Sequence, residues 1–368
     1  MPPPFTDLAK TLPASVPFVG PETQERRMGK PFRTRIGANE SIFGPSPKAI
    51  EAMRQAASDV WMYCDPENHD LRHALAAHHG VSPNNIVVGE GIDGLLGLTC
   101  RLFLTNGVPV VTSAGAYPTF NFHVAGFGGG LHTVPYRDDC EDPDALLDAA
   151  HEHSARLIYI ANPDNPMGTV HDAATIQRMI DHTPEDALLC LDEAYIEFAD
   201  NGTAPEIDID NPNVIRFRTF SKAYGMAGAR IGYAIAEKNL AVSFNKVRNH
   251  FGVSRISQAG ALAALGDQAY LQSIQQKVVD ARIKISDIAA AQGLHALPSQ
   301  TNFVTIDCGK DGDFARRVLA NLINQGVFAR MPGVAPMDRC IRITVGRDED
   351  LAIFADVLPK AIAAAEND

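Results

Sequence analysis

A lysine beside hydroxyl side chains stands in the segment TFSKAYGMAGARIGY, residues 219–233. Thr219 and Ser221 precede Lys222, and Arg230 follows after a bend that contains glycine. A lysine amine can form a Schiff base with a carbonyl cofactor, whereas hydroxyl groups and an arginine can bind a phosphate. Alone, a Ser-Lys pair in a loop is more typical of a solvated turn. The segment therefore predicts cofactor chemistry only if other segments supply further groups.

Two other segments carry polar residues that could take part. ANPDNPMG, residues 161–168, contains Asn165 between two prolines, and LDEAY, residues 191–195, contains Asp192 and Tyr195. Each has an alternative interpretation, because an asparagine commonly satisfies a turn and a carboxylate commonly caps a helix. The order and spacing of these segments together favour a shared site.

A glycine-rich loop, VVGEGIDGLL at residues 87–96, has the G-x-G-x-x-G spacing of a dinucleotide-binding turn. Such a site needs an acidic residue roughly 20 positions later for the ribose hydroxyls. No Asp or Glu occurs between Asp93 and Asp138. NAD binding is therefore disfavoured, and we expect the loop to bind a different phosphate.

Short apolar runs alternate with helical patterns through much of the chain, which predicts an α/β fold with a mostly parallel sheet covered on both faces. We expect this larger domain to span residues 46–250. Residues 251–368 combine long helical stretches with three strands, which predicts a smaller α+β domain. Residues 1–45 are proline-rich at the start and are expected to form an arm and part of the smaller domain. Pro359 is expected to kink or break the last helix.

Composition limits the class of function. The net charge of −12 argues against nucleic acid or an anionic membrane as a partner. Six scattered cysteines indicate neither a disulfide framework nor a zinc site, which favours a cytoplasmic protein. His69 and His73 have a helical spacing that could bind a metal, but no carboxylate or cysteine partner is evident. We therefore expect no metal site, and no signal peptide is recognised at the N-terminus.

Together these segments resemble the fold-type I pyridoxal-phosphate-dependent aminotransferases of class I and II, in the branch of histidinol-phosphate aminotransferase. The resemblance runs from GANESIFGPSP to IRITVGRDEDL and is most specific in TFSKAYGMAGARIGYA. It implies a large domain with a seven-stranded, mostly parallel sheet and a smaller α+β domain. It also implies pyridoxal 5'-phosphate as cofactor, and amino-group exchange between an amino donor and a 2-oxo acid by a ping-pong mechanism.

The resemblance assigns roles around the cofactor ring. Lys222 would hold the cofactor and then move a proton between substrate and cofactor. Asp192 would keep the pyridine nitrogen protonated, and Asn165 and Tyr195 would bind the phenolic oxygen. Tyr117, which is otherwise read as a core residue, would stack on the ring.

The resemblance also assigns the anion sites. The cofactor phosphate would lie at the helix start with its cup completed by other polar groups, a set made of Gly91, Ile92, Asp93, Thr219, Ser221 and Arg230. Tyr63 would reach the phosphate of a neighbouring subunit, which implies a homodimer with shared active sites. Arg342 would bind the substrate carboxylate or phosphate, although alone it reads as an outward strand residue. Asn39 and Arg330 are further candidates for substrate contact.

Two departures from the family pattern leave the substrate open. Ile92 stands where a serine or alanine is common, and Cys64 stands where proline is usual. Histidinol phosphate and aromatic amino acids both remain candidate donors. A decarboxylase of the threonine-phosphate type on the same fold is the alternative, because bond choice depends on how the substrate is held. A non-catalytic regulator would be expected to carry a helix-turn-helix extension, for which the short N-terminal segment leaves no room.

Overall fold

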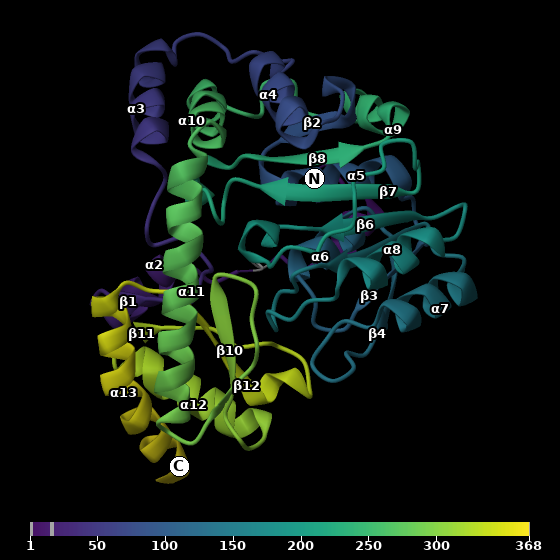
Figure 1. Ribbon diagram of the computed structural model, residues 1–368. Coiled ribbons are helices and arrows are strands. Elements are labelled where there is room, and N and C mark those ends of the chain that lie inside the picture. Colours follow the sequence, from purple (N-terminus) through teal and green to yellow (C-terminus); the bar gives the residue numbers. More distant parts are fainter. Residues whose placement is uncertain (1–2, 15–17, 368) are drawn as a thin grey trace.

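A seven-stranded sheet in the order β2-β8-β7-β6-β5-β3-β4 forms the centre of the larger part of the molecule (Figure 1). The computed structural model describes residues 3–14 and 18–367, so residues 1–2 and 15–17 of the expected arm lie outside the described residues. Strand β8 runs antiparallel to both of its neighbours, and the remaining pairs are parallel. The predicted mostly parallel sheet is therefore confirmed. The strands are β2 (Ile86–Gly89), β3 (Pro109–Ser113), β4 (Gly130–Val134), β5 (Leu157–Ala161), β6 (Leu188–Asp192), β7 (Val214–Thr219) and β8 (Gly232–Ala236).

Helices cover both faces of this sheet. Every residue of β5 and β6 is buried, which explains why these strands read as continuous apolar runs. Alternate residues of β5 pack on opposite faces, Leu157 and Tyr159 toward α5 and α6, Ile158 and Ile160 toward α7 and α8. The helices are α5 (Gly91–Phe103), α6 (Pro118–Gly126), α7 (Pro143–His153), α8 (Ala173–Asp181) and α9 (Lys238–Ser243).

Local capping signals set the ends of two early helices. Helix α3 (Pro47–Ala56) begins where the Ser46 side chain accepts a hydrogen bond from the Ala49 backbone. Helix α4 (His69–His79) ends at Gly80, whose φ of 68° lies in the left-handed region that glycine tolerates. Short 3-10 turns are η1 (Ala57–Asp59), η2 (Pro83–Asn85), η3 (Ile196–Phe198), η4 (Ala227–Ala229), η5 (Phe244–Lys246) and η6 (Met337–Arg339).

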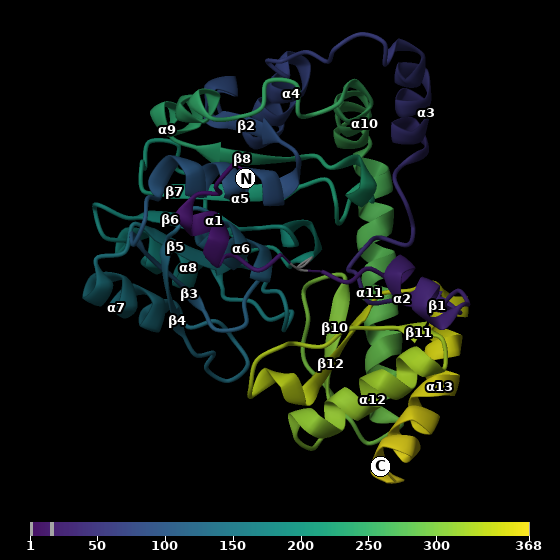
Figure 2. The ribbon, with the colours of Figure 1, turned by 180° about the vertical axis from the view of Figure 1, so that it is seen from behind.

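A smaller antiparallel sheet, in the order β12-β10-β9, lies beside the first. Its strands are β9 (His295–Ala296), β10 (Phe303–Asp307) and β12 (Cys340–Thr344). Helices α12 (Gly312–Asn324) and α13 (Asp348–Asn367) pack together there, and the long helix α11 (Gln268–Ala290) extends from beside α10 (Arg255–Leu265) to this sheet (Figures 1 and 2). Helix α10 itself packs against α3 and α4.

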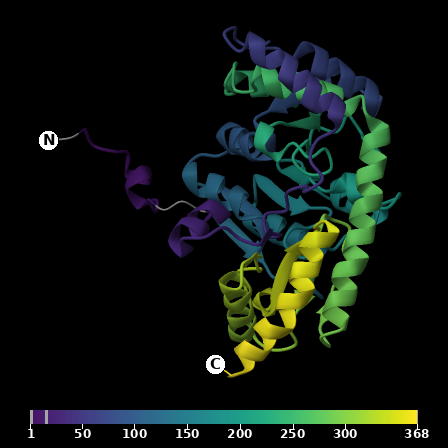
Figure 3. The same ribbon diagram turned by 90° about the vertical axis from the view of Figure 1, so that its left-hand side faces the viewer.

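The N-terminal segment joins this smaller part. Strand β1 (Thr34–Arg35) pairs in parallel with β11 (Val327–Phe328). Residues 7–11 and 21–28 form helices α1 (Asp7–Thr11) and α2 (Pro21–Met28), where no regular structure was expected. Thr6 caps the first helix and Pro21 opens the second. Neither helix buries a residue, and α1 lies at the edge of the molecule, with the Leu8 side chain near Gly128 (Figure 3).

The sequence predicted a kink or a break at Pro359, and the break is wrong. Helix α13 continues from Asp348 to Asn367 with Pro359 inside it. Buried side chains lie on both sides of the proline, at Phe354 and Leu358 before it and at Ala361 after it. Their packing holds the helix together although proline removes one backbone hydrogen bond. None of the helices in the described ranges is both long and apolar enough to cross a membrane.

Candidate active site

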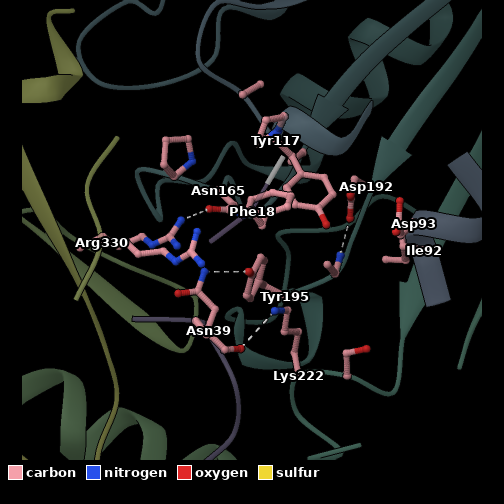
Figure 4. A pocket seen from close by; sticks show the side chains of 18 of the residues that line it. Phe18, Asn39, Ile92, Asp93, Tyr117, Asn165, Asp192, Tyr195, Lys222 and Arg330 are labelled. Atoms are coloured by element: carbon pink, nitrogen blue, oxygen red, sulfur yellow. Dashed lines mark hydrogen bonds between the residues drawn. The ribbon is translucent and has the colours of Figure 1, made fainter. Parts of the chain in front are cut away.

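A cavity of ≈ 590 Å³ lies where strands β5, β6 and β7 end and the smaller sheet faces them (Figure 4). Parallel sheets present ligand-binding groups at this edge. Thirteen of the fifteen candidate site residues line this cavity, and Gly91 and Tyr63 do not. The thirteen are Asn39, Ile92, Asp93, Tyr117, Asn165, Asp192, Tyr195, Thr219, Ser221, Lys222, Arg230, Arg330 and Arg342.

Lys222 points into this cavity from the loop after β7. Its Nζ donates a 3.1 Å hydrogen bond to the backbone oxygen of Asn39. Burial, and then the positive charge of Arg342, lower the pKa of Lys222 from 10.5 to about 8. A larger share of this amine is therefore neutral near neutral pH than in an exposed lysine, which suits it to attack a carbonyl group.

Asp192 is buried at the end of β6 and has two hydrogen-bond donors. The hydroxyl of Tyr159 lies 2.8 Å from Oδ2, and the backbone N–H of Ala194 lies 2.9 Å from Oδ1. Burial raises the pKa of Asp192 to about 6, against the effect of these donors. The carboxylate therefore faces the cavity with no cation bonded to it in the described part of the chain, ready for a positively charged ligand group.

Tyr159 is a site residue that sequence reasoning missed, because it lies inside an apolar strand. Its ring stacks on Phe120 at 4.6 Å, and its hydroxyl reaches Asp192 on the next strand. A signal was present: Ala161 pairs with Asp192 across the strands, and Tyr159 is two residues before Ala161, on the same face of β5. A tyrosine hydroxyl on that face needs a polar partner.

Asn39 links residues from distant segments beside the cavity. Asn39 has φ 57° and donates through Nδ2 to the Tyr195 hydroxyl at 3.1 Å. Its side-chain oxygen accepts a hydrogen bond from Thr344 on β12. These bonds hold the residue in an uncommon backbone conformation and link both sheets. Asn39 thus contacts Tyr195 and Lys222 directly, which gives it a more central place than the sequence suggested.

Arg342 points into the cavity from β12 and is not an outward strand residue. Its Nη1 donates to the side-chain oxygen of Asn165, and its guanidinium lies 5.1 Å from the centroid of the Phe303 ring. Burial lowers the pKa of Arg342 to about 10. The bond to Oδ1 leaves the amide nitrogen of Asn165 available as a donor.

Arg330 stands in the same wall between two aromatic rings. Its guanidinium carbon is 5.6 Å from the ring centroids of both Phe18 and Phe328, and Nη2 donates to the backbone oxygen of Val19. The Nε atoms of Arg330 and Arg342 are buried without a partner among the described residues. Two arginine side chains in one cavity wall favour an anionic ligand.

The start of helix α5 forms another positive region, separate from Arg330 and Arg342. Helix α5 begins at Gly91, where φ is 80°. A side-chain carbon at Gly91 would collide with the guanidinium of Arg230, so only glycine fits. Arg230 Nη1 lies 3.4 Å from the Ser221 hydroxyl, and the Ser221 backbone N–H donates to the Thr219 hydroxyl at 3.0 Å. Free N–H groups at a helix start together with an arginine form an anion-binding cup.

The two remaining tyrosines occupy different places. Tyr117 lines the cavity at the start of α6, and burial raises its pKa to about 12. Tyr63 lies outside the cavity with 78% of its surface exposed, stacked on Phe251 at 4.6 Å. Tyr117 therefore faces the cavity of its own chain, whereas Tyr63 does not.

Comparisons with known proteins agree with this geometry. The family model for aminotransferase class I and II matches residues 34–358. The chain belongs to this family. It is 33% identical to the histidinol-phosphate aminotransferase of Halalkalibacterium halodurans over 95% of this chain and 96% of the relative, and 35% identical to that of Anaeromyxobacter sp. over 91% and 93%. The crystal structure of the histidinol-phosphate aminotransferase from Sinorhizobium meliloti in complex with pyridoxal-5'-phosphate matches with a TM-score of 0.95 and 54% identity, covering 98% of this chain and 97% of the other.

The protein is a pyridoxal-phosphate-dependent aminotransferase, and its substrates are amino and keto acids as a class. Its cavity fits that cofactor. A buried lysine lies beside a buried carboxylate, and the glycine at residue 91 lets the Arg230 guanidinium lie against the start of α5, where a phosphate would bind. The glycine loop therefore belongs to an aminotransferase, not to an NAD enzyme. A threonine-phosphate decarboxylase structure shares the fold at 18% identity, which gives the alternative less support.

Proposed function

We propose that this aminotransferase takes its amino group from an amino alcohol phosphate of the histidinol phosphate type and passes it to a 2-oxo acid. The observation that carries the proposal is the pair Arg330 and Arg342 in one wall of the cavity that holds Lys222. Both side chains line this cavity, so two positive charges face the same space. A phosphate with two negative charges matches two guanidinium groups better than a single carboxylate does.

Each residue around the cofactor has a proposed task. When bound, pyridoxal phosphate supplies a carbonyl group for amines and a ring that accepts electrons. Lys222 Nζ binds that carbonyl group and, once released, moves the proton at the substrate carbon. Asp192 holds a proton at the ring nitrogen, while the amide nitrogen of Asn165 and the hydroxyl of Tyr195 donate to the phenolic oxygen. Tyr117 packs on the ring face.

The anion cup has its own proposed task. The backbone N–H groups at the start of α5 and the Arg230 guanidinium bind the cofactor phosphate, and the Thr219 hydroxyl holds the Ser221 backbone in position. The backbone set is Gly91, Ile92 and Asp93. Asn39 orients Tyr195 and receives the released amine of Lys222.

The absorption spectrum of the purified protein tests the proposal. Pyridoxal phosphate is added to saturation, and histidinol phosphate, glutamate and phenylalanine are then added in separate samples. Bleaching of the cofactor band by histidinol phosphate at the lowest concentration supports the proposal. Bleaching by phenylalanine at a lower concentration than histidinol phosphate would favour an aromatic donor and contradict it. Release of carbon dioxide from threonine phosphate, added in a further sample, without amino transfer would indicate the decarboxylase.

We also propose a homodimer in which Tyr63 reaches the phosphate in the neighbouring subunit. Apolar side chains are exposed around it, and 80% of the Trp61 surface and 60% of the Val60 surface are free in the single chain. Such a patch is typical of a protein interface. Light scattering should give twice the chain mass, and Tyr63→Ala should weaken cofactor binding without changing that mass. A monomeric active enzyme would contradict this arrangement.

The domain division and the location remain proposals as well. We propose a larger cofactor-binding domain of residues 46–250 and a smaller domain of residues 251–368, with residues 1–45 contributing to the smaller one. The pairing of β1 with β11 supports the last part. A cytoplasmic location is supported by the six cysteines, which are all free.

A further inference from the structure

Two carboxyl side chains are buried together behind the loop that carries Asn165. Glu141 and Asp164 each expose only 2% of their surface, and their carboxyl groups are hydrogen-bonded to each other. Neither forms an ion pair with a lysine, arginine or histidine among the residues that the structure describes. Two carboxylates cannot bond to each other without a proton, so one of the pair is a neutral acid that donates to the other.

Glu141 is attached to the ends of two strands of the large sheet. The Ser113 hydroxyl at the end of β3 lies 2.6 Å from Oε2. The backbone N–H of Ala161 at the end of β5 lies 2.9 Å from Oε1. Burial raises the pKa of Glu141 well above its usual range, with the charge of Asp164 as the next cause. The two carboxyl groups therefore share one proton.

Asp164 connects this acid to the active-site loop. Its Oδ1 accepts from the Tyr136 hydroxyl at 2.9 Å, and its Oδ2 accepts from the backbone N–H of Met167 at 2.9 Å. The next residue in the chain is Asn165, which contacts Arg342 in the cavity. Glu141 is therefore linked to the cavity by its contact with the Asp164 carboxyl group and by the peptide bond between Asp164 and Asn165.

A buried polar pair of this kind is seldom a gain in stability over an apolar pair of similar size, so a role in orientation is the better explanation. We propose that Glu141 is a positioning residue whose carboxyl group shares a proton with Asp164, and that through Asp164 it sets the orientation of Asn165 toward the cofactor and Arg342. This inference rests on the role of Asn165 in the proposed function.

Substitutions at Glu141 in the holoenzyme test the proposal. Glu141→Gln keeps a donor for Asp164 and an acceptor for Ala161, because the Ser113 hydroxyl can turn to accept. We expect this variant to keep kcat/KM within about threefold of the wild type. Glu141→Ala removes the donor, and we expect kcat/KM to fall roughly tenfold or more because a small misplacement near the reacting atoms is costly. Of these two variants, Glu141→Ala should shift the pH midpoint of the bound cofactor's absorption, whereas Glu141→Gln should not.

Controls separate orientation from a general loss of stability. Leu146→Ala removes buried volume from α7, in an apolar cluster that contains no residue of the 162–168 loop, and it should leave the spectrum unchanged. If Glu141→Ala does not fold, Asp164→Ala gives the same test, because it removes the carboxyl group that accepts from Tyr136 and Met167 and contacts Glu141. That variant should shift the spectrum as well.

A double-substitution cycle with Asn165→Ala shows whether Glu141 acts through Asn165. The combined loss should be smaller than the product of the single losses. Equal losses of kcat/KM in Glu141→Gln and Glu141→Ala would overturn the proposal, because they would mean that the site needs a charged carboxylate at residue 141 and not a hydrogen-bond donor. A combined loss equal to the product of the single losses would overturn the proposal too, because the two residues would then act independently. If Asn165→Ala itself leaves the spectrum and kcat unchanged, the role of Asn165 in the proposed function fails instead.

Discussion

The hydroxyl of Tyr159 donates a 2.8 Å hydrogen bond to Asp192, and both residues are buried where β5 and β6 lie side by side. This bond lowers the pKa of Asp192, whereas burial raises it to about 6. The tyrosine thus favours the ionised form of the carboxylate that faces the cavity. Tyr159, inside β5, thus affects the protonation of Asp192 at the end of β6.

Tyr159→Phe should lower kcat roughly tenfold, the order expected for one hydrogen bond to a charged group. The phenylalanine ring keeps the stacking on Phe120, so the fold should remain stable. KM should change little if the substrate does not touch this hydroxyl. Tyr233→Phe is the matched control, because it removes a buried hydroxyl that bonds to His79 outside the cavity. Steady-state kinetics at several pH values check the prediction, and an unchanged kcat in Tyr159→Phe would contradict it.

The pKa of Lys222 predicts how fast the cofactor-free protein takes up pyridoxal phosphate. Burial lowers this pKa from 10.5 to about 8, and only the neutral amine attacks a carbonyl. The rate of covalent uptake should therefore rise with pH, with a midpoint near 8, and level off above it. Stopped-flow absorbance of the cofactor band measures the rate. A midpoint near 10.5 would show an amine that is not perturbed, and Lys222→Ala should give no covalent band and no turnover.

Glu193, the neighbour of Asp192, is predicted to affect stability more than chemistry. Its carboxylate forms ion pairs with Arg216 and Arg218, and all three side chains are largely buried. Burial alone would raise the pKa of Glu193, but the two arginines outweigh it and lower the value to about 2. Glu193→Gln leaves two buried charges without a partner and should cost about 3–5 kcal/mol in unfolding free energy.

The sign of the pH dependence follows from that pKa. The folded-state pKa of Glu193 lies below its ordinary value of 4.5, so its contribution is present above pH 4.5 and is lost as pH falls toward about 2. The difference in unfolding free energy between wild type and Glu193→Gln should therefore shrink over this range. Urea unfolding at a series of pH values measures it, with the exposed Glu185→Gln as control. A difference that stays constant with pH would contradict the assignment.

Much of the fold follows from local patterns in the chain. Several strands of the large sheet are continuous apolar runs, such as β5 and β6. The caps at Ser46 and Gly80 mark helix ends through side-chain and backbone chemistry that acts over a few residues. Pro359 does not break the last helix, because buried side chains before and after it pack against the rest of the protein. This is a tertiary effect that the local sequence does not show. Helices α1 and α2 were missed because they are short and bury nothing.

The site was predictable to a different extent. Lys222, Asp192 and Asn165 stand in motifs whose residue order could be read along the chain. The contacts of Asn39 with Tyr195 and of Arg342 with Asn165 join segments more than 150 positions apart, so no local pattern contains them. Glu141 gave no signal either, because a carboxyl next to a helix cap looks like an exposed residue until the fold buries it.

Substitution of the two arginines should separate the effect on phosphorylated donors from the effect on carboxylate donors. Arg342 bonds to Asn165 inside the cavity, so Arg342→Lys should lower kcat/KM by about 100-fold for every amino donor, since lysine cannot replace the guanidinium fork. Arg330 lies between Phe18 and Phe328 and does not contact Asn165, so Arg330→Gln should raise KM for phosphorylated donors about tenfold and leave carboxylate donors nearly unchanged. Kinetics with histidinol phosphate and with glutamate test both variants. An equal loss of kcat/KM for both donors in Arg330→Gln would show that this arginine supports the wall of the cavity and does not bind the substrate phosphate.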